Sequence, residues 1–357
     1  MASDEYIKAL RIIAQERGIP QEELVHLIED SLAKAYIKTL SEEEKSAAEV
    51  YAVVNEKGYK VFCKKKVSLY VNNPRLEISI DDTEKINPNA TIGDIIEVEV
   101  TPSNFGRVAA NVFKQAINQK INETERNKIY EQFETQIGKI VTGYINRKDI
   151  KKDGSSVYVI DFGKVEGILP YKEQIPGEAF STGDLVKFYL LDVRADENKN
   201  LKTIELSRTH PGFVKRLFEL ETPEIADGTV EIQAIVREAG LRTKISVSTR
   251  NENVEPLGAC IGTNSSRIQA ILNHLNGEKI DIIEYSDDPS KYITNALSPA
   301  TPISIEITEE VIKDEKRLHA TVTVPKKQLS LAIGKGGINA KLAAKLTKCK
   351  MDIIAED

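Results

Sequence analysis

The sequence contains few of the residues on which disulfide, metal and redox chemistry depends. Its 357 residues include no tryptophan, three cysteines and four histidines, all widely separated. Because the cysteines form no C-x-x-C pair, they predict reduced, buried side chains and neither a disulfide framework nor a zinc site. The scattered histidines likewise indicate no histidine-based catalytic centre. We therefore expect no metal and no cofactor.

Long apolar runs and an apolar leader are also missing. No stretch of about twenty consecutive apolar residues occurs, so we expect no membrane-spanning helix. The first residues, MASDEYIKAL, are acidic and lack the apolar core of a signal peptide, which favours a cytoplasmic protein. With 41% hydrophobic residues, the chain is long enough for two to four domains with several small cores.

Positive charge is scarce overall but is concentrated in one segment. The net charge of −6 disfavours nucleic acid as a partner of the whole surface. However, residues 326–350 contain seven lysines and no acid, whereas residues 1–50 contain eleven acids and six bases. Such asymmetry predicts that the two ends meet different partners, although a solvated face is the simpler explanation of any single charge run.

A glycine loop lies inside the lysine-rich segment, in LAIGKGGINAKLAAKLTKCK at 331–350. The P-loop pattern G-x-x-x-x-G-K-[ST] is absent, and Asn339 stands where the dinucleotide pattern G-x-G-x-x-G needs glycine. What remains is a G-x-x-G loop at 334–337. Between two helices such a loop can clamp the backbone of about four nucleotides. Alone it is a weak signal, because glycine serves any chain reversal that needs a positive φ.

The glycine loop belongs to an internal repeat. Residues 259–283 align with residues 331–354, with Gly262 opposite Gly334 at an offset of 72. This period is too long for a solenoid and suits a duplicated small domain. Each copy predicts the order helix, strand, strand, helix, helix, strand. The helix after each loop has an apolar stripe that should face a core.

Residues 137–208 predict a separate all-β unit. Five short strand candidates, separated by turns rich in Gly, Asp and Asn, fit an OB-type barrel, a fold often used to bind oligonucleotides. Exposed aromatic side chains in such a barrel stack on bases, each worth about 1–3 kcal/mol. We expect half of the candidates to be core instead. The candidates are Tyr144, Tyr158, Phe162 and Tyr171, with Lys148, Lys151, Lys152 and Lys164 nearby in sequence.

Residues 1–135 predict a mixed helical and β region. One helix is expected over residues 3–18 with Ser3 as its N-cap, a second from Pro20 to about residue 39, and a long third from about 107 to 136. Three strands lie between the second and third helices, and the Asp81-Asp82 pair is expected in a loop. The second helix should expose an acidic face, which consists of Glu22, Glu23, Glu29 and Asp30.

Several longer segments carry a family resemblance. LSRTHPGFVKRLFELETPEIADGTVEI (206–232), REAGLRTKISV (237–247), GEKIDII (277–283) and NALSPA (295–300) resemble the NusA family of bacterial transcription factors. The order of the parts matches as well, over essentially the whole chain. Some relatives carry acidic repeats after the last domain, so a chain that stops at Asp357 either lacks them or is a fragment.

The resemblance implies a multidomain α+β protein. Its parts would be an N-terminal helical and β domain over 1–135, an OB-type S1 β-barrel over 136–208, and two bacterial-type (type II) KH domains in tandem over 209–284 and 285–357. The implied function is that of an RNA-binding transcription elongation factor, which is not an enzyme and modulates pausing, termination and antitermination. The N-terminal domain would bind RNA polymerase, and S1-KH-KH would bind nascent single-stranded RNA. Other elongation or antitermination factors and the ribosome are further candidate partners.

The same resemblance places the RNA-binding residues in the KH loops and the helices that follow. They are Gly334, Lys335, Gly336, Gly337, Asn339, Lys341 and Lys345 in the second copy, and Gly262, Thr263, Asn264, Ser265 and Arg267 in the first. The first loop departs from the family pattern, since it lacks both the last glycine and the basic residue. A position that tolerates positive φ is thereby lost, and Arg267 is the cation that remains. We therefore expect the second copy to grip RNA more strongly.

Two other functions stay open on the residues alone. The chain could be an S1/KH component of ribosome-associated or RNA-decay machinery, although no nuclease core is visible. An enzyme would require acidic pairs such as Asp81-Asp82 or Asp287-Asp288 to bind Mg²⁺. Asp288 before Pro289 is better explained as a helix start, and adjacent side chains point apart in extended structure. We therefore predict no catalytic residue.

Overall fold

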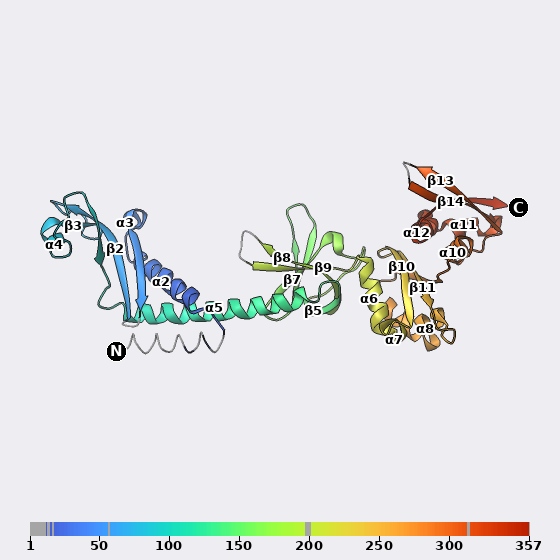
Figure 1. The fold of residues 1–357 in the computed structure, drawn as a ribbon, viewed down its shortest axis with the longest axis horizontal. Coiled ribbons are helices and arrows are strands. Elements are labelled where there is room, and N and C mark those ends of the chain that lie inside the picture. Colours follow the sequence, from blue (N-terminus) through green and yellow to red (C-terminus); the bar gives the residue numbers. More distant parts are fainter. Residues whose placement is uncertain are drawn as a thin grey trace. The chain divides into compact units, whose positions relative to one another are not determined.

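The computed structural model describes residues 12, 15, 18–55, 58–196, 201–312 and 315–356. The chain forms two compact units that divide between Lys128 and Ile129 (Figure 1). Most of the helix expected over residues 3–18, including Ser3, lies outside the described residues. The turn expected at Asn198-Lys199-Asn200 and the terminal Asp357 also lie outside them.

The first unit packs helices against a four-stranded sheet. In this sheet β2 pairs with β1 and β4 in antiparallel fashion and with β3 in parallel. The core forms where α2 and the start of α5 contact the hairpin of β1 and β2. The elements are α2 (Gln21–Ile37), α3 (Glu42–Ala47), β1 (Glu49–Asn55), β2 (Gly58–Ser68), β3 (Glu77–Ser79), α4 (Ile80–Glu84), β4 (Ile95–Glu99) and α5 (Gly106–Glu134).

The prediction that Asp81 and Asp82 lie in a loop is wrong. Asp81 and Asp82 lie in the first turn of α4, where the Ser79 hydroxyl accepts the backbone N–H of Asp82 at 3.2 Å. Carboxylates in the first turn of a helix are favourable because they face the positive end of the helix dipole. The Asp82 carboxylate also pairs with Lys85 at 2.8 Å, so this acid has a structural role.

The acidic face expected on α2 is smaller than predicted. The Glu29 carboxylate accepts the backbone N–H of Val54 at 2.9 Å, and its side chain is 20% exposed. Glu23 pairs with Lys120 of α5 at 2.7 Å while remaining half exposed. Glu22 and Asp30 are exposed, as predicted. The face therefore consists of three acids, because Glu29 fastens α2 to the sheet.

The second unit begins with a closed five-stranded barrel, which confirms the OB-type fold. Its strand order is β5-β6-β7-β9-β8. The strands are β5 (Ile140–Ile150), β6 (Ser156–Asp161), β7 (Glu166–Pro170), β8 (Leu185–Asp196) and β9 (Leu201–Ser207). The last turn of α5 contributes Tyr130 and Phe133 to the barrel core, and the Phe133 ring lies 4.9 Å from that of Phe162.

Two α+β repeats follow the barrel in the predicted element order, except that the first repeat has one additional short helix before its first strand. Each sheet pairs its first two strands in antiparallel fashion and adds the third in parallel. The first repeat contains α6 (Pro211–Glu221), α7 (Pro223–Ala226), β10 (Val230–Glu238), β11 (Arg242–Thr249), α8 (Pro256–Ile261), α9 (Ser266–Leu272) and β12 (Lys279–Glu284). The second contains α10 (Pro289–Ala296), β13 (Ser304–Ile312), β14 (Glu315–Pro325), α11 (Leu329–Ile333), α12 (Ile338–Thr347) and β15 (Cys349–Glu356).

Buried cations join the first repeat to its neighbours on both sides. Arg208, 3% exposed, pairs with Glu178 of the barrel at 2.5 Å and donates to the His274 carbonyl at 2.7 Å. Lys244, fully buried, pairs with Asp281 at 2.7 Å and donates to the Ser298 carbonyl of the second repeat at 3.1 Å. Because an unpaired buried charge costs several kcal/mol, these contacts hold the barrel and the repeats together.

Candidate nucleic-acid interface

The two glycine loops, at residues 262–265 and 334–337, have nearly the same backbone conformation. Each loop opens with a glycine at φ 75°, and ψ is 168° in the first loop and 167° in the second. The third residues are Asn264 (φ 51°, ψ 34°) and Gly336 (φ 62°, ψ 22°), and the fourth are Ser265 (φ 61°, ψ 22°) and Gly337 (φ 75°, ψ 9°). In both loops the fourth N–H donates to the first carbonyl, at 3.1 and 3.0 Å.

The expectation that the first loop loses a left-handed position is therefore wrong. Ser265 adopts the positive φ without being glycine, although this conformation costs an L-residue roughly 1–2 kcal/mol. The opening glycine is required in both loops, because its positive φ is combined with a close approach of the helix that follows. A Cβ at Gly262 would lie 2.6 Å from Cγ of Arg267, and one at Gly334 would lie 2.9 Å from the backbone nitrogen of Asn339. The loops thus differ in side-chain chemistry and not in backbone shape.

The second loop and the helix after it carry exposed positive charge. Lys335 lies between the glycines, and Lys341 and Lys345 lie one turn apart on α12. The Lys341 ammonium also pairs with Glu238 of the first repeat at 3.0 Å while 53% of its side chain stays exposed. All seven lysines of residues 326–350 are exposed. Exposed cations beside a backbone clamp are suited to phosphate contacts.

Two of the predicted RNA-binding side chains are engaged inside the protein. Asn339 is fully buried, and its amide donates to the carbonyls of Leu297 at 3.1 Å and Ala332 at 3.0 Å. Arg267 pairs with Glu224 of α7 at 2.7 Å and donates to the Ala259 carbonyl at 2.5 Å. Asn339 therefore supports the loop from behind, and the cation expected to remain at the first loop is already paired.

The barrel aromatics divide into two exposed and two packed side chains, as expected. Tyr144 is 54% exposed and Tyr171 65% exposed, so both offer faces for stacking. Tyr158 is 2% exposed and lies beneath the Lys148 ammonium, which is 5.1 Å from the ring centroid. Phe162 packs against the core instead of facing solvent.

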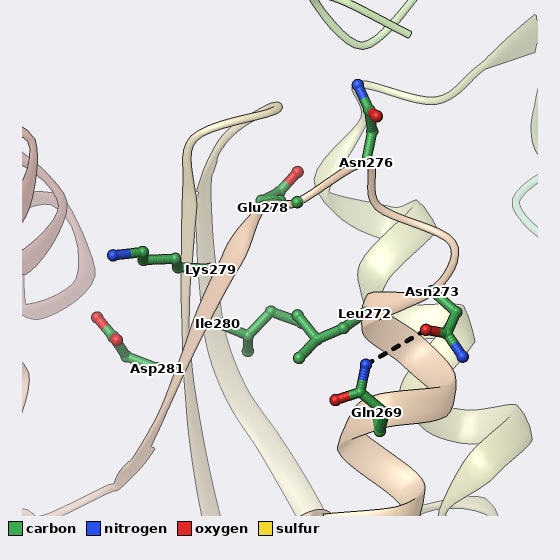
Figure 2. A pocket seen from close by; sticks show the side chains of 9 residues that line it. Gln269, Leu272, Asn273, Asn276, Glu278, Lys279, Ile280 and Asp281 are labelled. Carbon is green, nitrogen blue, oxygen red and sulfur yellow. Dashed lines mark hydrogen bonds between the residues drawn. The ribbon is translucent and has the colours of Figure 1, made fainter. Parts of the chain in front are cut away.

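A groove with a volume of about 700 Å³ lies between α9 and β12, and the sequence interpretation missed it (Figure 2). The amides of Gln269 and Asn273 line it from the helix, and Leu272 and Ile280 point toward each other between helix and strand. Lys279 belongs to β12, and its side chain points away from α9. The sequence feature that could have indicated this groove is the i, i+4 spacing of two amide side chains on the helix that follows the first glycine loop.

The described part of the chain shows no metal centre and no membrane span. Among those residues, no three His, Cys, Asp or Glu side chains are grouped so that they could hold a metal ion. Asp288 caps α10 by accepting the backbone N–H of Ser290 at 3.0 Å, as predicted from Pro289. None of the helices described is long and apolar enough to cross a bilayer.

Comparisons with known proteins give consistent matches along the chain. Family models match the NusA N-terminal domain at residues 5–127, the NusA-like first KH domain at 208–285 and the NusA-like second KH domain at 289–357. The chain is 44% identical to the transcription termination/antitermination protein NusA of Halalkalibacterium halodurans over 355 residues, which cover 99% of this chain and 89% of that protein.

Another relative and one solved structure are also similar to this chain. NusA of Thermus thermophilus is 38% identical over 351 residues, 96% of this chain and 88% of that protein. The solution structure of the N-terminal domain of NusA from Bacillus subtilis covers 35% of this chain and 98% of that domain, with 38% identity and a TM-score of 0.29.

Proposed function

Because this chain belongs to the NusA family of transcription termination/antitermination proteins, we propose that it binds RNA polymerase through its first unit and nascent single-stranded RNA through its second. It is an RNA-binding transcription factor built from a barrel and two tandem KH domains. Family membership favours this function over a role in the ribosome or in RNA decay. We further propose a cytoplasmic location and contacts with other elongation factors.

The second loop carries the RNA-binding part of the proposal. Its left-handed backbone lets nucleic acid approach closely, and Lys335 and Lys345 supply exposed charge. If four or five lysines contact phosphates, the logarithm of the affinity should fall with the logarithm of salt concentration with a slope of about −3 to −3.5. A flat response would contradict an interface based on phosphate contacts.

The duplicated loop offers a matched test. Changing Lys335 and Gly336 to Asp puts two negative charges in the second loop, and changing Thr263 and Asn264 to Asp does the same in the first. We expect the larger loss of affinity for single-stranded RNA from the change in the second loop, since only that loop loses a cation. Circular dichroism would verify the fold of both variants. Unchanged RNA affinity in both would mean that the loops are only turns.

The first unit supports the polymerase-binding part of the proposal. Its acids Glu22, Glu23 and Asp30 are exposed on α2 and suit a basic or mixed partner better than RNA. A deletion should end at Lys128, because removal of Tyr130 and Phe133 would also open the barrel core. We expect this deletion to abolish co-purification with RNA polymerase while single-stranded RNA still binds. The opposite result would reverse the roles of the two units.

We also propose that the protein acts by binding and not by catalysis. The acidic pairs that could serve an Mg²⁺-dependent reaction have structural partners, since Asp82 pairs with Lys85 and Asp288 caps α10. Incubation of labelled RNA with the purified protein and Mg²⁺ should leave the RNA intact. RNA cleavage that disappears in an Asp82→Asn variant would contradict this proposal.

A further inference from the structure

The outer face of the first KH sheet is covered by the second KH domain. This face is the side of the sheet that is turned away from α8 and α9. The helices α10 and α12 pack on it and lie between the two KH sheets (Figure 1). The Tyr292 hydroxyl of α10 donates to the Ser246 hydroxyl at 2.9 Å, and Ile283 beside it is only 2% exposed. One face of a KH sheet in this chain therefore serves to bind helices.

The equivalent face of the second KH sheet is open to solvent. Asp281 aligns with Asp352 in the repeat, and the strand pairing extends this match to the neighbouring strands. Ile283 then corresponds to Ile354, which is 48% exposed. Across the three strands, Ala234-Ser246-Ile283 corresponds to Ser304-Thr323-Ile354, and Val236-Lys244-Asp281 corresponds to Glu306-Thr321-Asp352. The chain thus repeats a docking surface and uses the first copy internally.

The central row of three residues differs in charge between the two sheets. In the first sheet the fully buried Lys244 pairs with its acidic neighbour at 2.7 Å and donates to the Ser298 carbonyl, just after α10. In the second sheet Thr321 takes the place of this lysine, and the exposed Glu306 takes the place of an apolar residue. The row therefore carries two carboxylates, those of Glu306 and Asp352, and no cation. An interface of the same kind needs its cation from the partner.

The charge of the central row selects the kind of partner. Carboxylates repel phosphate, so a protein that carries a cation suits the centre of this face better than RNA does. The next row contains His319, whose Nε2 lies 2.8 Å from an Asp352 oxygen, and the exposed Lys350. The row on the other side contains Ile354. A helix with a lysine or arginine beside apolar residues would meet Glu306 with its cation and Ile354 with its apolar surface.

We propose that the outer face of the second KH sheet binds a helical element of RNA polymerase that carries a lysine or arginine opposite Thr321. This inference rests on the proposed function, which makes RNA polymerase the protein partner of the chain, and it adds a contact to the one proposed for the first unit. The glycine loop at 334–337 lies on the other side of the sheet, between α11 and α12. The outer face can therefore contact the polymerase while the loop holds RNA.

Site-specific cross-linking tests which molecule reaches this face. The full chain carries the photoreactive residue p-benzoylphenylalanine in place of Ile354 and is bound to an elongation complex of a bacterial RNA polymerase. We expect a cross-link to a polymerase subunit, at a helix that contains a lysine or arginine. The same photoreactive residue in place of Leu220, which is 59% exposed on α6, is the matched control and should cross-link more weakly.

Charge reversal tests the expected cation of the partner. Glu306→Lys should weaken binding of the full chain to core RNA polymerase about 3- to 10-fold, because it replaces an exposed ionic contact with repulsion. Glu252→Lys makes the same change at an exposed site of the first KH domain and should leave this affinity within about twofold. Neither variant should lose affinity for single-stranded RNA, since both gain positive charge.

Several results would overturn this inference while polymerase binding itself persists. The photoreactive residue at position 354 could cross-link only to RNA, only to a second copy of the chain, or to the polymerase no more than the control does. An unchanged polymerase affinity of the Glu306→Lys protein would likewise contradict the ionic contact. A wild-type chain that does not bind RNA polymerase at all would contradict the proposed function, and the inference would fall with it.

Discussion

Adding one lysine to the first loop tests whether its backbone can still clamp RNA. Thr263 is exposed and occupies the position of Lys335 in the repeat. The residues on both sides of Thr263 have nearly the backbone angles of their counterparts in the second loop. Thr263→Lys should therefore place an ammonium group where the second loop has one. We expect this single change to make the first loop resemble the second in its response to salt.

The magnitude follows from counterion release. Each phosphate contact with single-stranded nucleic acid contributes about −0.7 to the slope of log affinity against log salt. A fourfold rise in salt should therefore weaken the Thr263→Lys protein about 2.5-fold more than the wild type. At low salt, an exposed ionic contact is worth up to about 1 kcal/mol, so affinity should rise by up to about fivefold. The reverse change, Lys335→Thr, should reduce the slope by about 0.7.

Fluorescence anisotropy with a labelled U octamer between 50 and 200 mM salt would measure these slopes. Gln233→Lys adds the same charge to β10 and serves as the control. A Thr263→Lys slope equal to that of wild type would show that RNA does not contact the first loop. An equal change in Gln233→Lys would show that net charge alone is responsible.

Four further predictions concern stability and reactivity. Glu278 is buried and accepts three hydrogen bonds from Arg237, so Glu278→Gln should lower the free energy of unfolding by about 3–5 kcal/mol in urea titrations; a loss below about 1 kcal/mol would contradict this. Burial lowers the pKa of His274 below 6.5, so the unfolded chain takes up the proton first as pH falls. Stability should therefore decline below about pH 6.5, and His274→Gln should flatten this part of the melting profile. Burial raises the pKa of Cys260 to about 12, so a thiol reagent at pH 8 should modify Cys260 only after unfolding, and rapid reaction of the native protein would refute this. Ser265→Gly should raise the free energy of unfolding by about 1 kcal/mol, because glycine accepts the positive φ without strain; a destabilised variant would contradict this.

Much of the fold could be predicted from local patterns. Short strand-like segments between turn residues located all five barrel strands, because Gly, Asp and Asn mark the points where the chain reverses. The internal repeat predicted a duplicated small α+β domain, which the family resemblance identified as a pair of KH domains. Asp288 before Pro289 predicted the start of α10. The concentration of positive charge in residues 326–350 was also predicted, and all seven lysines of this segment are exposed.

The candidate site was only partly predictable. The loop residues Lys335 and Gly336 are exposed as expected, but Asn339 is buried and Arg267 is paired with Glu224, 43 residues earlier in the chain. Glu29 was misplaced for the same reason, since its partner Val54 lies 25 residues away. Spacing within one helix shows which side chains share a face. It does not show which other segment that face meets.

What the sequence alone determined, then, is the set of elements, their order and the duplication, because these depend on periodicity, capping and turn chemistry within short segments. Only the tertiary structure decided the backbone conformation of each glycine loop and the surroundings of the helix that follows it. Packing of α8 against α9 holds Ser265 in a conformation that its own propensity disfavours. Placement of β12 beside α9 turns Gln269 and Asn273 from two polar helix residues into the wall of a groove. Both outcomes depend on packing between separate elements, which the periodicity within any one element does not reveal.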